Sequence, residues 1–459
     1  MANTNENLQN DAFIADSDKT IFALATPGGK SGVAVLRVSG PAVKTLPDYL
    51  GITKPLMPRM AELVTIKHPK TGEWIDKALA LSFPAPHSFT GEDVLEFHLH
   101  GSRAILHQMI TALSDHPSCR HAEAGEFTRR AFMNEKMDLT AAEGLADLID
   151  SESHAQQQQA IRIMQGHVGS QLELLRGRIL HSLAMMEAYI DFPDEEIPES
   201  VTTQTNDEIT QIQNELITIL DDNAVGEKIR DGISVVIIGP PNAGKSSLLN
   251  TLAKRDVAIV SDIAGTTRDV IEVELDIDGY LVTLIDTAGL RDTAESIEEE
   301  GIRRAKEKAS HADLKIAVLE NIPDTEHNHD ILELLTENDL LVINKSDLLS
   351  GPKTAPQSPI HPLFLSTKTS DGLTELIEAL RGKMEELMVS NQTPIITRTR
   401  HREALQQCVV HLTSFLSGGP LELMTEELRL AANQIAKITG KFDVDDILDI
   451  VFSRFCIGK

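Results

Sequence analysis

A glycine-rich segment near the middle of the chain has the residue types and spacing of a phosphate-binding loop. Residues 239–246 read G-P-P-N-A-G-K-S, after an apolar run at residues 233–238 and before a helix-like stretch at residues 247–254. The glycines allow backbone N–H groups to surround phosphate oxygens, and the N-terminus of the following helix adds positive potential. The pattern predicts that Lys245 reaches the β- and γ-phosphates and that the Ser246 hydroxyl binds Mg²⁺.

Two later stretches have the residue types of segments that sense a γ-phosphate. Residues 262–269, D-I-A-G-T-T-R-D, place Thr267 where a first switch segment would contact Mg²⁺ and the γ-phosphate. A strand-like run at residues 281–285 ends in D-T-A-G at residues 286–289. This position puts a carboxylate beside the metal and a glycine N–H toward the γ-phosphate.

Two further motifs predict that the base is guanine. N-K-S-D at residues 344–347 follows a strand-like run, and the Asp347 carboxylate can accept hydrogen bonds from guanine N1–H and N2–H₂, which adenine cannot offer. S-T-K at residues 366–368 fits the final base-contacting loop. We therefore expect GTP as the ligand. The residues expected to bind it are Asn242, Ala243, Gly244, Lys245, Ser246, Ser247, Asp262, Ala264, Gly265, Thr267, Asp286, Thr287, Ala288, Gly289, Asn344, Lys345, Asp347, Ser366, Thr367 and Lys368.

The residue that would orient the attacking water is not the usual one. Ras-type enzymes use a glutamine for this purpose, whereas Leu290 follows D-T-A-G here. Two candidates remain, namely the amide of Asn242, which could hold a monovalent cation, and a carboxylate within residues 295–300. Glu299 and Glu300 are interpreted as solvated helix residues that form i,i+4 pairs with arginines.

Composition limits the setting and the partners. The 459 residues suggest about three domains, and the net charge of −28 repels phosphate backbones, so a nucleic-acid partner requires a local basic patch or help from another protein. Cys119, Cys408 and Cys456 are too scattered for a disulfide framework or a cysteine-based zinc site, which favours a reducing, cytoplasmic location. The polar residues 1–18 predict a disordered tail, and no apolar run is long enough to span a membrane.

Upstream of these motifs, residues 19–134 predict an α+β domain. Strand-like runs alternate with Pro, Gly and Ser clusters, and residues 103–113 have a helical pattern. The loop at residues 26–32 lacks the G-K-[ST] ending, so we interpret it as a tight turn rather than a second phosphate site. His98, His100 and His107 lack completing ligands and are interpreted as ordinary histidines rather than a metal cluster.

Helical sequence lies on both sides of the nucleotide-binding region. Apolar residues recur at steps of three or four from Ile161 to Ile190, which predicts one long amphipathic helix in a bundle, with residues 156–159 on its solvated surface. Prolines within residues 191–198 mark a hinge, and helical periodicity resumes over residues 206–230. We therefore expect a GTPase domain at residues 231–390 inserted into a helical domain whose halves are residues 135–230 and 391–459.

Several segments outside the nucleotide-binding region match one family. They are residues 32–40 (GVAVLRVSG), 88–96 (SFTGEDVLE), 124–132 (AGEFTRRAF), 191–198 (DFPDEEIP) and 455–459 (FCIGK). Over nearly its whole length the chain resembles the tRNA-modifying GTPases of the MnmE (also TrmE) family. The resemblance implies a multidomain fold: an α+β N-terminal domain that dimerises and binds 5-formyltetrahydrofolate or a related one-carbon folate, an α-helical bundle in two halves, and an inserted α/β P-loop GTPase domain.

The resemblance also implies roles for individual residues. K⁺ would be held by Asn242 together with Ser261, Ile263 and Thr266, and Ser261 stands where relatives often have threonine. Glu298 falls where the family places its water-orienting glutamate. The positions that the family associates with the folate are occupied by Arg37, Glu96, Lys136 and Lys459.

The implied reaction is addition of a carboxymethylaminomethyl-type group to C5 of the wobble uridine of certain tRNAs by a homodimer acting with a flavin-dependent partner that resembles MnmG. The central domain alone also fits a ribosome-assembly switch without modification activity, although the terminal domains lack a basic RNA-binding module. A helical scaffold with a vestigial GTPase is a third, weaker reading. For Cys456 the sequence leaves open whether it is a nucleophile or a small packed residue.

Overall fold

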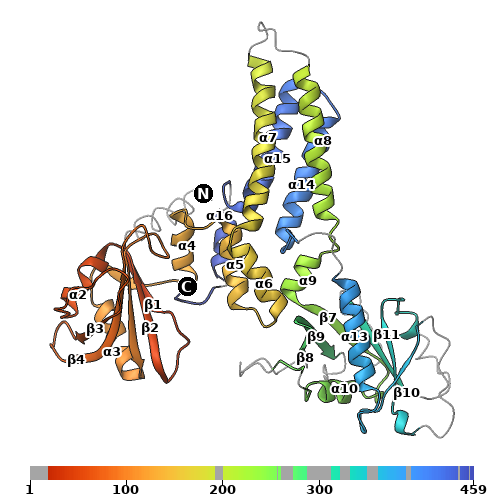
Figure 1. Cartoon of the computed structure of the whole chain (residues 1–459), viewed down its shortest axis with the longest axis horizontal. Helices are drawn as coiled ribbons and strands as arrows, with labels where there is room; N and C mark the ends of the chain where they lie inside the picture. The colour runs from red at the N-terminus through yellow and green to blue at the C-terminus, as the bar shows by residue number, and fades with distance from the viewer. Residues whose placement is uncertain are drawn as a thin grey trace, which may run out of the picture. The chain divides into compact units, whose positions relative to one another are not determined.

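The computed structural model describes residues 19–191, 200–255, 257–259, 272–286, 312–320, 331–348, 360–388, 394–442, 445–453 and 455–458. The chain divides into two compact units (Figure 1). The N-terminal unit contains residues 1–146, 164–170 and 436–459, and the central unit contains residues 147–163 and 171–435. Among the described helices, none has the length and apolar character needed to cross a membrane.

The N-terminal unit is built on a six-stranded sheet. Its neighbours are antiparallel except for β1 and β6, which are parallel, and the strand order is β3-β4-β5-β2-β1-β6. One face packs against α3 (Arg103–Ser114), whose Leu106, Met109 and Leu113 join the buried core of the sheet. The strands and the helix expected here are therefore confirmed. Their bounds are β1 Thr20–Leu24, β2 Ser31–Ser39, β3 Glu62–Lys67, β4 Trp74–Phe83, β5 Val94–Gly101 and β6 Cys119–His121, with η1 Pro41–Lys44 and α2 Leu46–Tyr49 between β2 and β3.

The end of the chain completes this unit. Helix α16 (Asp445–Ser453) packs its Leu448, Val451 and Phe452 against α5 (Leu139–Ile149), and α4 (Glu126–Met133) lies alongside. Gly125, at the start of α4, has φ +66°, and a Cβ there would lie 2.4 Å from the Phe452 carbonyl oxygen. The residues after α16 form a β-bridge between Ile457 and Ala124. Segments far apart in the sequence thus form one core.

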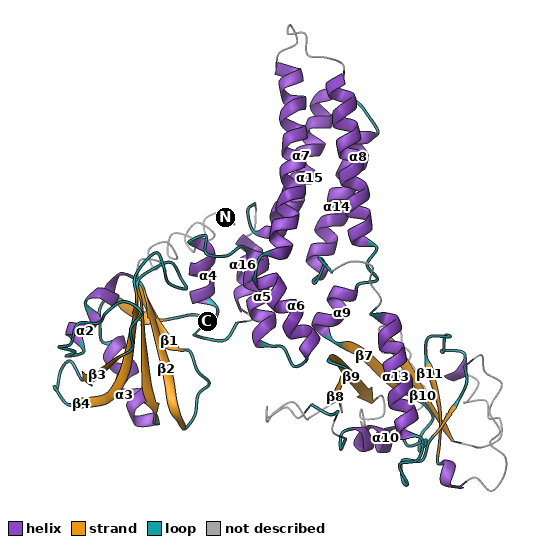
Figure 2. Cartoon of the chain, in the orientation of Figure 1, coloured by secondary structure: helices purple, strands orange, loops and turns teal. Residues whose placement is uncertain are grey.

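In the central unit, the long helices α7, α8, α14 and α15 form an antiparallel bundle (Figure 2). Polar contacts link each neighbouring pair: Arg178 of α7 with Glu208 and Glu215 of α8, Gln213 of α8 with Thr413 of α14, His411 of α14 with Glu427 of α15, and Arg429 of α15 with Glu187 of α7. Apolar stripes on all four helices fill the interior. The helix bounds are α7 His167–Asp191, α8 Ser200–Leu220, α14 Thr399–Leu416 and α15 Leu421–Thr439.

The prediction of one continuous helix from Ile161 to Ile190 is wrong. Helix α6 (His154–Met164) ends before Gly166, which has φ +81°, and α7 begins at His167. A left-handed residue cannot continue a right-handed helix, and glycine adopts this conformation without steric cost. Buried apolar residues continue on both sides of the break, with Ile163 before it and Val168 after it. Met164, which the predicted apolar stripe included, is exposed.

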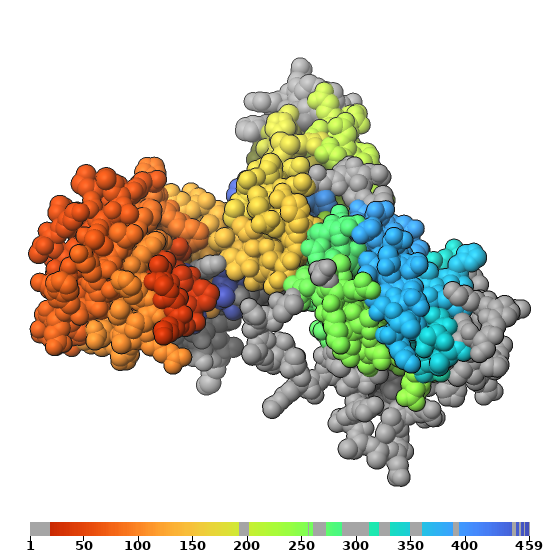
Figure 3. Space-filling view, turned by 60° about the horizontal axis from the view of Figure 1, so that its bottom comes forward, coloured from red at the N-terminus to blue at the C-terminus, as the bar shows by residue number. Residues whose placement is uncertain are grey.

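A second six-stranded sheet carries the predicted GTPase motifs. Its order is β12-β11-β10-β7-β9-β8, with parallel neighbours except β8 and β9. Helices α10 and α13 contribute to the core on one face, and residues 331–335 pack against the other. The surfaces of α10 and α13 also lie side by side in the space-filling view (Figure 3). The bounds are β7 Ile233–Ile238, α10 Lys245–Leu252, β8 Glu272–Ile277, β9 Tyr280–Asp286, β10 Leu314–Glu320, β11 Leu340–Asn344, η2 Ser346–Leu348, β12 Leu363–Phe364 and α13 Leu373–Leu387.

Two glycine substitutions test the packing of the N-terminal unit and of helix α7, and we expect them to change stability in opposite directions. Gly125→Ala should destabilise the N-terminal unit by at least about 1 kcal/mol, because alanine strains the positive φ and overlaps the Phe452 carbonyl. Gly177→Ala, in open space on α7, should stabilise its helix by roughly 0.5–1 kcal/mol, because alanine is the better helix former. Hydrogen exchange of α16 and α7 peptides in the full chain measures both effects. Unchanged α16 protection in Gly125→Ala would contradict the proposed packing.

Candidate functional site

The phosphate loop lies at the carboxyl end of a central strand. Strand β7 ends at Ile238, the loop spans residues 239–244, and α10 begins at Lys245. Two of its glycines are required by close approach of other segments. A Cβ on Gly239 would lie 2.2 Å from the Val318 carbonyl oxygen, and one on Gly244 would lie 2.1 Å from Asn344 Nδ2. The loop is thus packed tightly against β10 and the base-reading segment.

Lys245 is folded over the loop that precedes it. Its side chain is buried, and Nζ donates hydrogen bonds to the carbonyl oxygens of Gly239 at 2.7 Å and Pro240 at 3.0 Å. Burial lowers the pKa of Lys245, whereas the negative charge of Asp286 acts in the opposite direction. The ammonium group is therefore held inside the loop, where phosphate oxygens would replace the two carbonyls as its partners.

A hydroxyl and a carboxylate meet beside the lysine. Ser246 Oγ donates a 2.5 Å hydrogen bond to Oδ2 of Asp286, which is fully buried at the end of β9. Oxygen ligands of these two kinds suit Mg²⁺, which binds one or two protein oxygens together with phosphate oxygens. In the described part of the chain, no group of three His, Cys, Asp or Glu residues could hold a metal ion.

One buried amide connects the phosphate loop with the base-reading loops. Asn344, at the end of β11, donates from Nδ2 to the Ala243 carbonyl oxygen at 2.8 Å. Its Oδ1 accepts a 3.2 Å hydrogen bond from the Thr367 N–H. Because Asn344 is fully buried, both contacts are shielded from water. The motifs at residues 239–246, 344–347 and 366–368 therefore form one connected site.

Asp347 is oriented by the third loop. The Ser366 hydroxyl donates to Asp347 Oδ1 at 2.7 Å and accepts a 3.2 Å hydrogen bond from the Thr369 N–H. Lys345 has φ +59° and forms an ion pair with Glu320 at the end of β10. Glu320 was missed from the sequence, although the position that ends β10 lies directly beside Asn344 in the sheet register. Asp347 itself is exposed, so a ligand could reach its carboxylate.

The remaining predicted nucleotide residues have varied positions. Asn242 is exposed with φ +66°, Ala243 is buried in the loop, Ser247 is exposed in the first turn of α10, and Lys368 is exposed. The expected switch residues and the family-implied glutamate and lysine lie outside the described residues. These are Ser261, Asp262, Ile263, Ala264, Gly265, Thr266, Thr267, Thr287, Ala288, Gly289, Leu290, Glu298 and Lys459.

Two residues that the family resemblance associates with the folate are cross-strand partners in the N-terminal unit. Arg37 of β2 lies opposite Glu96 of β5, and Arg37 Nε donates to Glu96 Oε1 at 2.8 Å. The guanidinium carbon is 5.4 Å from the ring centre of Phe89 and 5.8 Å from that of Phe127. Lys136 is exposed, and its Cε is 3.1 Å from where a Cβ on Gly91 would lie. The pair combines a carboxylate, a guanidinium and aromatic faces.

Phe127 is held in place by a buried charge network. Its neighbour Glu126 is only 3% exposed and accepts hydrogen bonds from Arg120 and Arg130. Burial acts to raise the pKa of Glu126, but hydrogen bonds from Arg120 and the Glu123 N–H, together with the charge of Arg130, outweigh burial and lower it. Glu126 is therefore ionised at neutral pH and anchors α4 beside the sheet.

Cys456 is exposed in the bend after α16. Of the two alternatives that the sequence leaves open for Cys456, this exposure does not fit a small packed side chain. By contrast, Cys119 and Cys408 are buried, and burial raises the pKa of their thiols to about 11 and about 12.

Comparisons with known proteins match nearly the whole chain. A family model described as the MnmE helical domain matches residues 139–456, and one described as the GTP-binding protein TrmE N-terminus matches residues 20–136. The tRNA modification GTPase MnmE of Parvibaculum lavamentivorans (strain DS-1) is 47% identical over 445 residues, which cover 96% of this chain and 100% of the relative. That of Paramagnetospirillum magneticum (strain AMB-1) is 46% identical over 442 residues, with the same coverage.

Several solved structures also match part of the chain. The crystal structure of the G domain of the T. maritima FeoB iron transporter is 28% identical and covers 33% of this chain and 98% of its own, with a TM-score of 0.26. The two family models and the full-length relatives carry the assignment without it. The chain belongs to the MnmE (TrmE) family.

Proposed function

We propose that this protein hydrolyses GTP in order to modify C5 of the wobble uridine of certain tRNAs, adding a carboxymethylaminomethyl-type group together with a flavin-dependent partner that resembles MnmG. The observation that carries the proposal is the Asn344 junction, which joins a phosphate loop and a guanine-reading carboxylate in one buried network. The named relatives are tRNA modification GTPases, which favours tRNA as the substrate. A basic surface on the partner would offset the net charge of −28.

Within this proposal the domains divide the work. Residues 19–134 dimerise and bind a one-carbon folate, residues 135–230 and 391–459 form the helical domain, and residues 231–390 hydrolyse GTP. The Ser246 hydroxyl and the Asp286 carboxylate would hold Mg²⁺, which neutralises phosphate charge. Asn242 would contribute its amide oxygen to K⁺, and Glu298 would orient water. Arg37, Glu96, Lys136 and Lys459 would bind the folate.

The proposed homodimer is supported by an apolar row on the open face of the N-terminal sheet. Leu63 of β3 lies opposite Leu79 of β4, and their side chains are 51% and 40% exposed. His98 of β5 continues this row beside Leu79, and its Nε2 is buried without a hydrogen-bond partner. A second copy of the chain would remove the exposed side chains of Leu63 and Leu79 from water.

Nucleoside analysis of tRNA tests the reaction. Cells that lack this gene should lose the modified wobble uridine, and the intact gene should restore it. A gene encoding Asp347→Asn should restore it poorly at normal GTP levels, because guanine reading is lost. Unchanged wobble uridines in the deletion strain would favour the alternative of a ribosome-assembly switch, in which case ribosomal subunit profiles would change instead.

Nucleotide competition tests the base-reading role of Asp347. Asp347→Asn should weaken GTP binding about 100-fold or more, because hydrogen bonds from guanine to a charged acceptor are lost. Binding of xanthosine triphosphate should improve, since the new amide can donate to the xanthine carbonyl. Asparagine retains an oxygen for the Ser366 hydroxyl, so the loop should keep its conformation. Normal GTP affinity in this variant would refute the assignment.

Hydrolysis rates in different salts test the cation site. K⁺ should accelerate hydrolysis at least about tenfold more than Na⁺, because a fixed charge beside the phosphates stabilises the transition state. Asn242→Ala should abolish the difference. Since Asn242 has φ +66°, Asn242→Gly is the matched control that removes the amide without backbone strain, and it should behave in the same way. Equal rates of the parent protein in both salts would remove the cation argument.

A further inference from the structure

The polypeptide segments that precede and follow the nucleotide-binding region in the sequence contact each other. Entry is through α9 (Val225–Asp231), and exit is through residues 394–398, which lead into α14. A Cβ on Gly226 would lie 2.1 Å from the Ile396 carbonyl oxygen and 2.9 Å from Pro394 Cβ. We call residues 225–232 and 394–402 the neck. The two segments of the neck approach each other so closely that only glycine fits at position 226.

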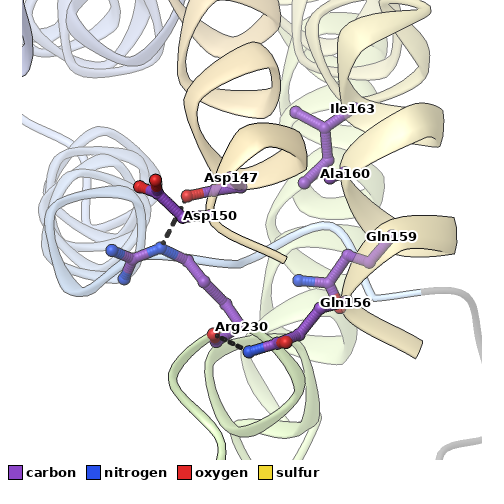
Figure 4. A pocket seen from close by; sticks show the side chains of 7 residues that line it. All are labelled: Asp147, Asp150, Gln156, Gln159, Ala160, Ile163 and Arg230. Atoms are coloured by element: carbon purple, nitrogen blue, oxygen red, sulfur yellow. Dashed lines mark hydrogen bonds and ion pairs between the residues drawn. The ribbon is translucent and has the colours of Figure 1, made fainter. Parts of the chain in front are cut away.

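One carboxylate joins both sides of the neck. Asp147, in α5, accepts from Arg230 Nε at 3.1 Å and from Arg398 Nη2 at 2.7 Å, both on the same oxygen, Oδ1 (Figure 4 shows the contact with Arg230). The side chain of Asp147 is 16% exposed, that of Arg230 is 21% exposed and that of Arg398 is 12% exposed. Charge-assisted hydrogen bonds in such a partly buried setting are stronger than those on an open surface.

Two glutamines bind the backbone of the same entry helix. Gln156 Nε2 donates to the Arg230 carbonyl oxygen at 2.9 Å (Figure 4). Gln159 Nε2 donates to the Gly226 carbonyl oxygen at 2.8 Å. The interpretation of residues 156–159 as a solvated surface is therefore wrong for these two. The Arg230 carbonyl lies in the last turn of α9, where carbonyls lack partners within the helix. Helix α6 thus caps and holds α9.

The exit helix is attached to the same neck. Arg402 of α14 donates to Asp222, to Glu227 and to the Leu220 carbonyl oxygen. Burial acts to lower the pKa of Arg402, but its hydrogen bonds to the two carboxylates outweigh burial and raise it. Arginines on both sides of the neck are therefore fixed by carboxylates from neighbouring elements.

The neck and α6 are in direct contact with the chain that builds the nucleotide site. Strand β7 begins two residues after α9 and runs straight into the phosphate loop. The Ala155 N–H donates to the Gly279 carbonyl oxygen at 2.9 Å, in the turn between β8 and β9, and β9 ends at Asp286. The segment from Asp147 to Ile163 therefore contacts α9, which leads into β7 and the phosphate loop, and the turn that leads into β9 and Asp286.

The arrangement also leaves space for movement. A cavity of about 100 Å³ lies beside Asp147, lined by Asp150, Gln156, Gln159, Ala160, Ile163 and Arg230 (Figure 4). Protein interiors are otherwise close-packed, and a polar cavity of this size accommodates water or a displaced side chain. Arg230 borders the cavity and can move into it when its bond to Asp147 breaks.

We propose that Asp147 is a positioning residue that couples the nucleotide site to the helical domain. It holds the entry and exit of the GTPase region on one oxygen, so a nucleotide-dependent shift of β7 is transmitted to α5 and α14. The inference rests on the proposed GTP binding and adds the residue through which that binding reaches the rest of the chain.

Hydrogen exchange of the full-length protein tests the coupling, with and without GDP and aluminium fluoride. In the parent protein the nucleotide should change the exchange of peptides from α9 and residues 394–402. Asp147→Asn should raise α9 exchange about tenfold, because the charged acceptor shared by Arg230 and Arg398 is lost, and the nucleotide should no longer alter this exchange. Asp147→Glu should retain the nucleotide effect. Asp150→Asn, an exposed carboxylate on the same cavity, is the matched control and should resemble the parent.

Affinity for a fluorescent GTP analogue separates coupling from binding. All variants should bind it within about twofold of the parent, because none of the substitutions lies in the nucleotide site. A nucleotide effect that persists in Asp147→Asn, even with faster exchange, would show a purely structural role and overturn the proposal. If the parent protein binds GTP but the nucleotide does not change the hydrogen exchange of the neck, only the coupling would be overturned. A parent protein that binds no guanine nucleotide would overturn both this inference and the proposed function.

Discussion

The nucleotide site depends on the buried amide of Asn344. This one side chain satisfies a carbonyl of the phosphate loop and an N–H of the third loop, with no exposure to water. Glycine at position 244 is required because the amide occupies the space that a Cβ would fill. An unpaired amide at this position would be costly, so the three loops must either be assembled together or be disrupted together. Guanine recognition and phosphate binding are therefore parts of one structure.

The parallel sheet explains why motifs widely separated in sequence meet here. Strands β7, β9, β10 and β11 all present their carboxyl ends on the same edge, which is where the phosphate loop, Asp286, Glu320 and Asn344 lie. Ligands of open α/β sheets bind at this edge. The strands themselves are buried on both faces, which is typical of a parallel sheet.

The sequence predicted the residues of this site better than the connections around it. Motifs such as N-K-S-D are local, so their place at a strand end follows from the apolar run before them. The break at Gly166 was missed because apolar periodicity continues across it, and a single glycine within a helical pattern does not reveal its φ. Gln156 and Gln159 look solvated in the sequence, since their carbonyl partners lie on α9 more than 65 residues later. Glu320 likewise becomes informative only when strand register is known.

The packing of the last helix has a consequence for synthesis of the protein. Residues 445–458 complete the core and the edge of a unit whose sheet is made from residues 20–121, and Gly458 lies against Leu24. About 300 residues separate α5 from α16, so at typical translation rates roughly 15–60 seconds pass before this surface can be covered. During that interval, apolar residues of α4 and α5 are exposed on the nascent chain. The N-terminal unit therefore begins to fold first and is completed last.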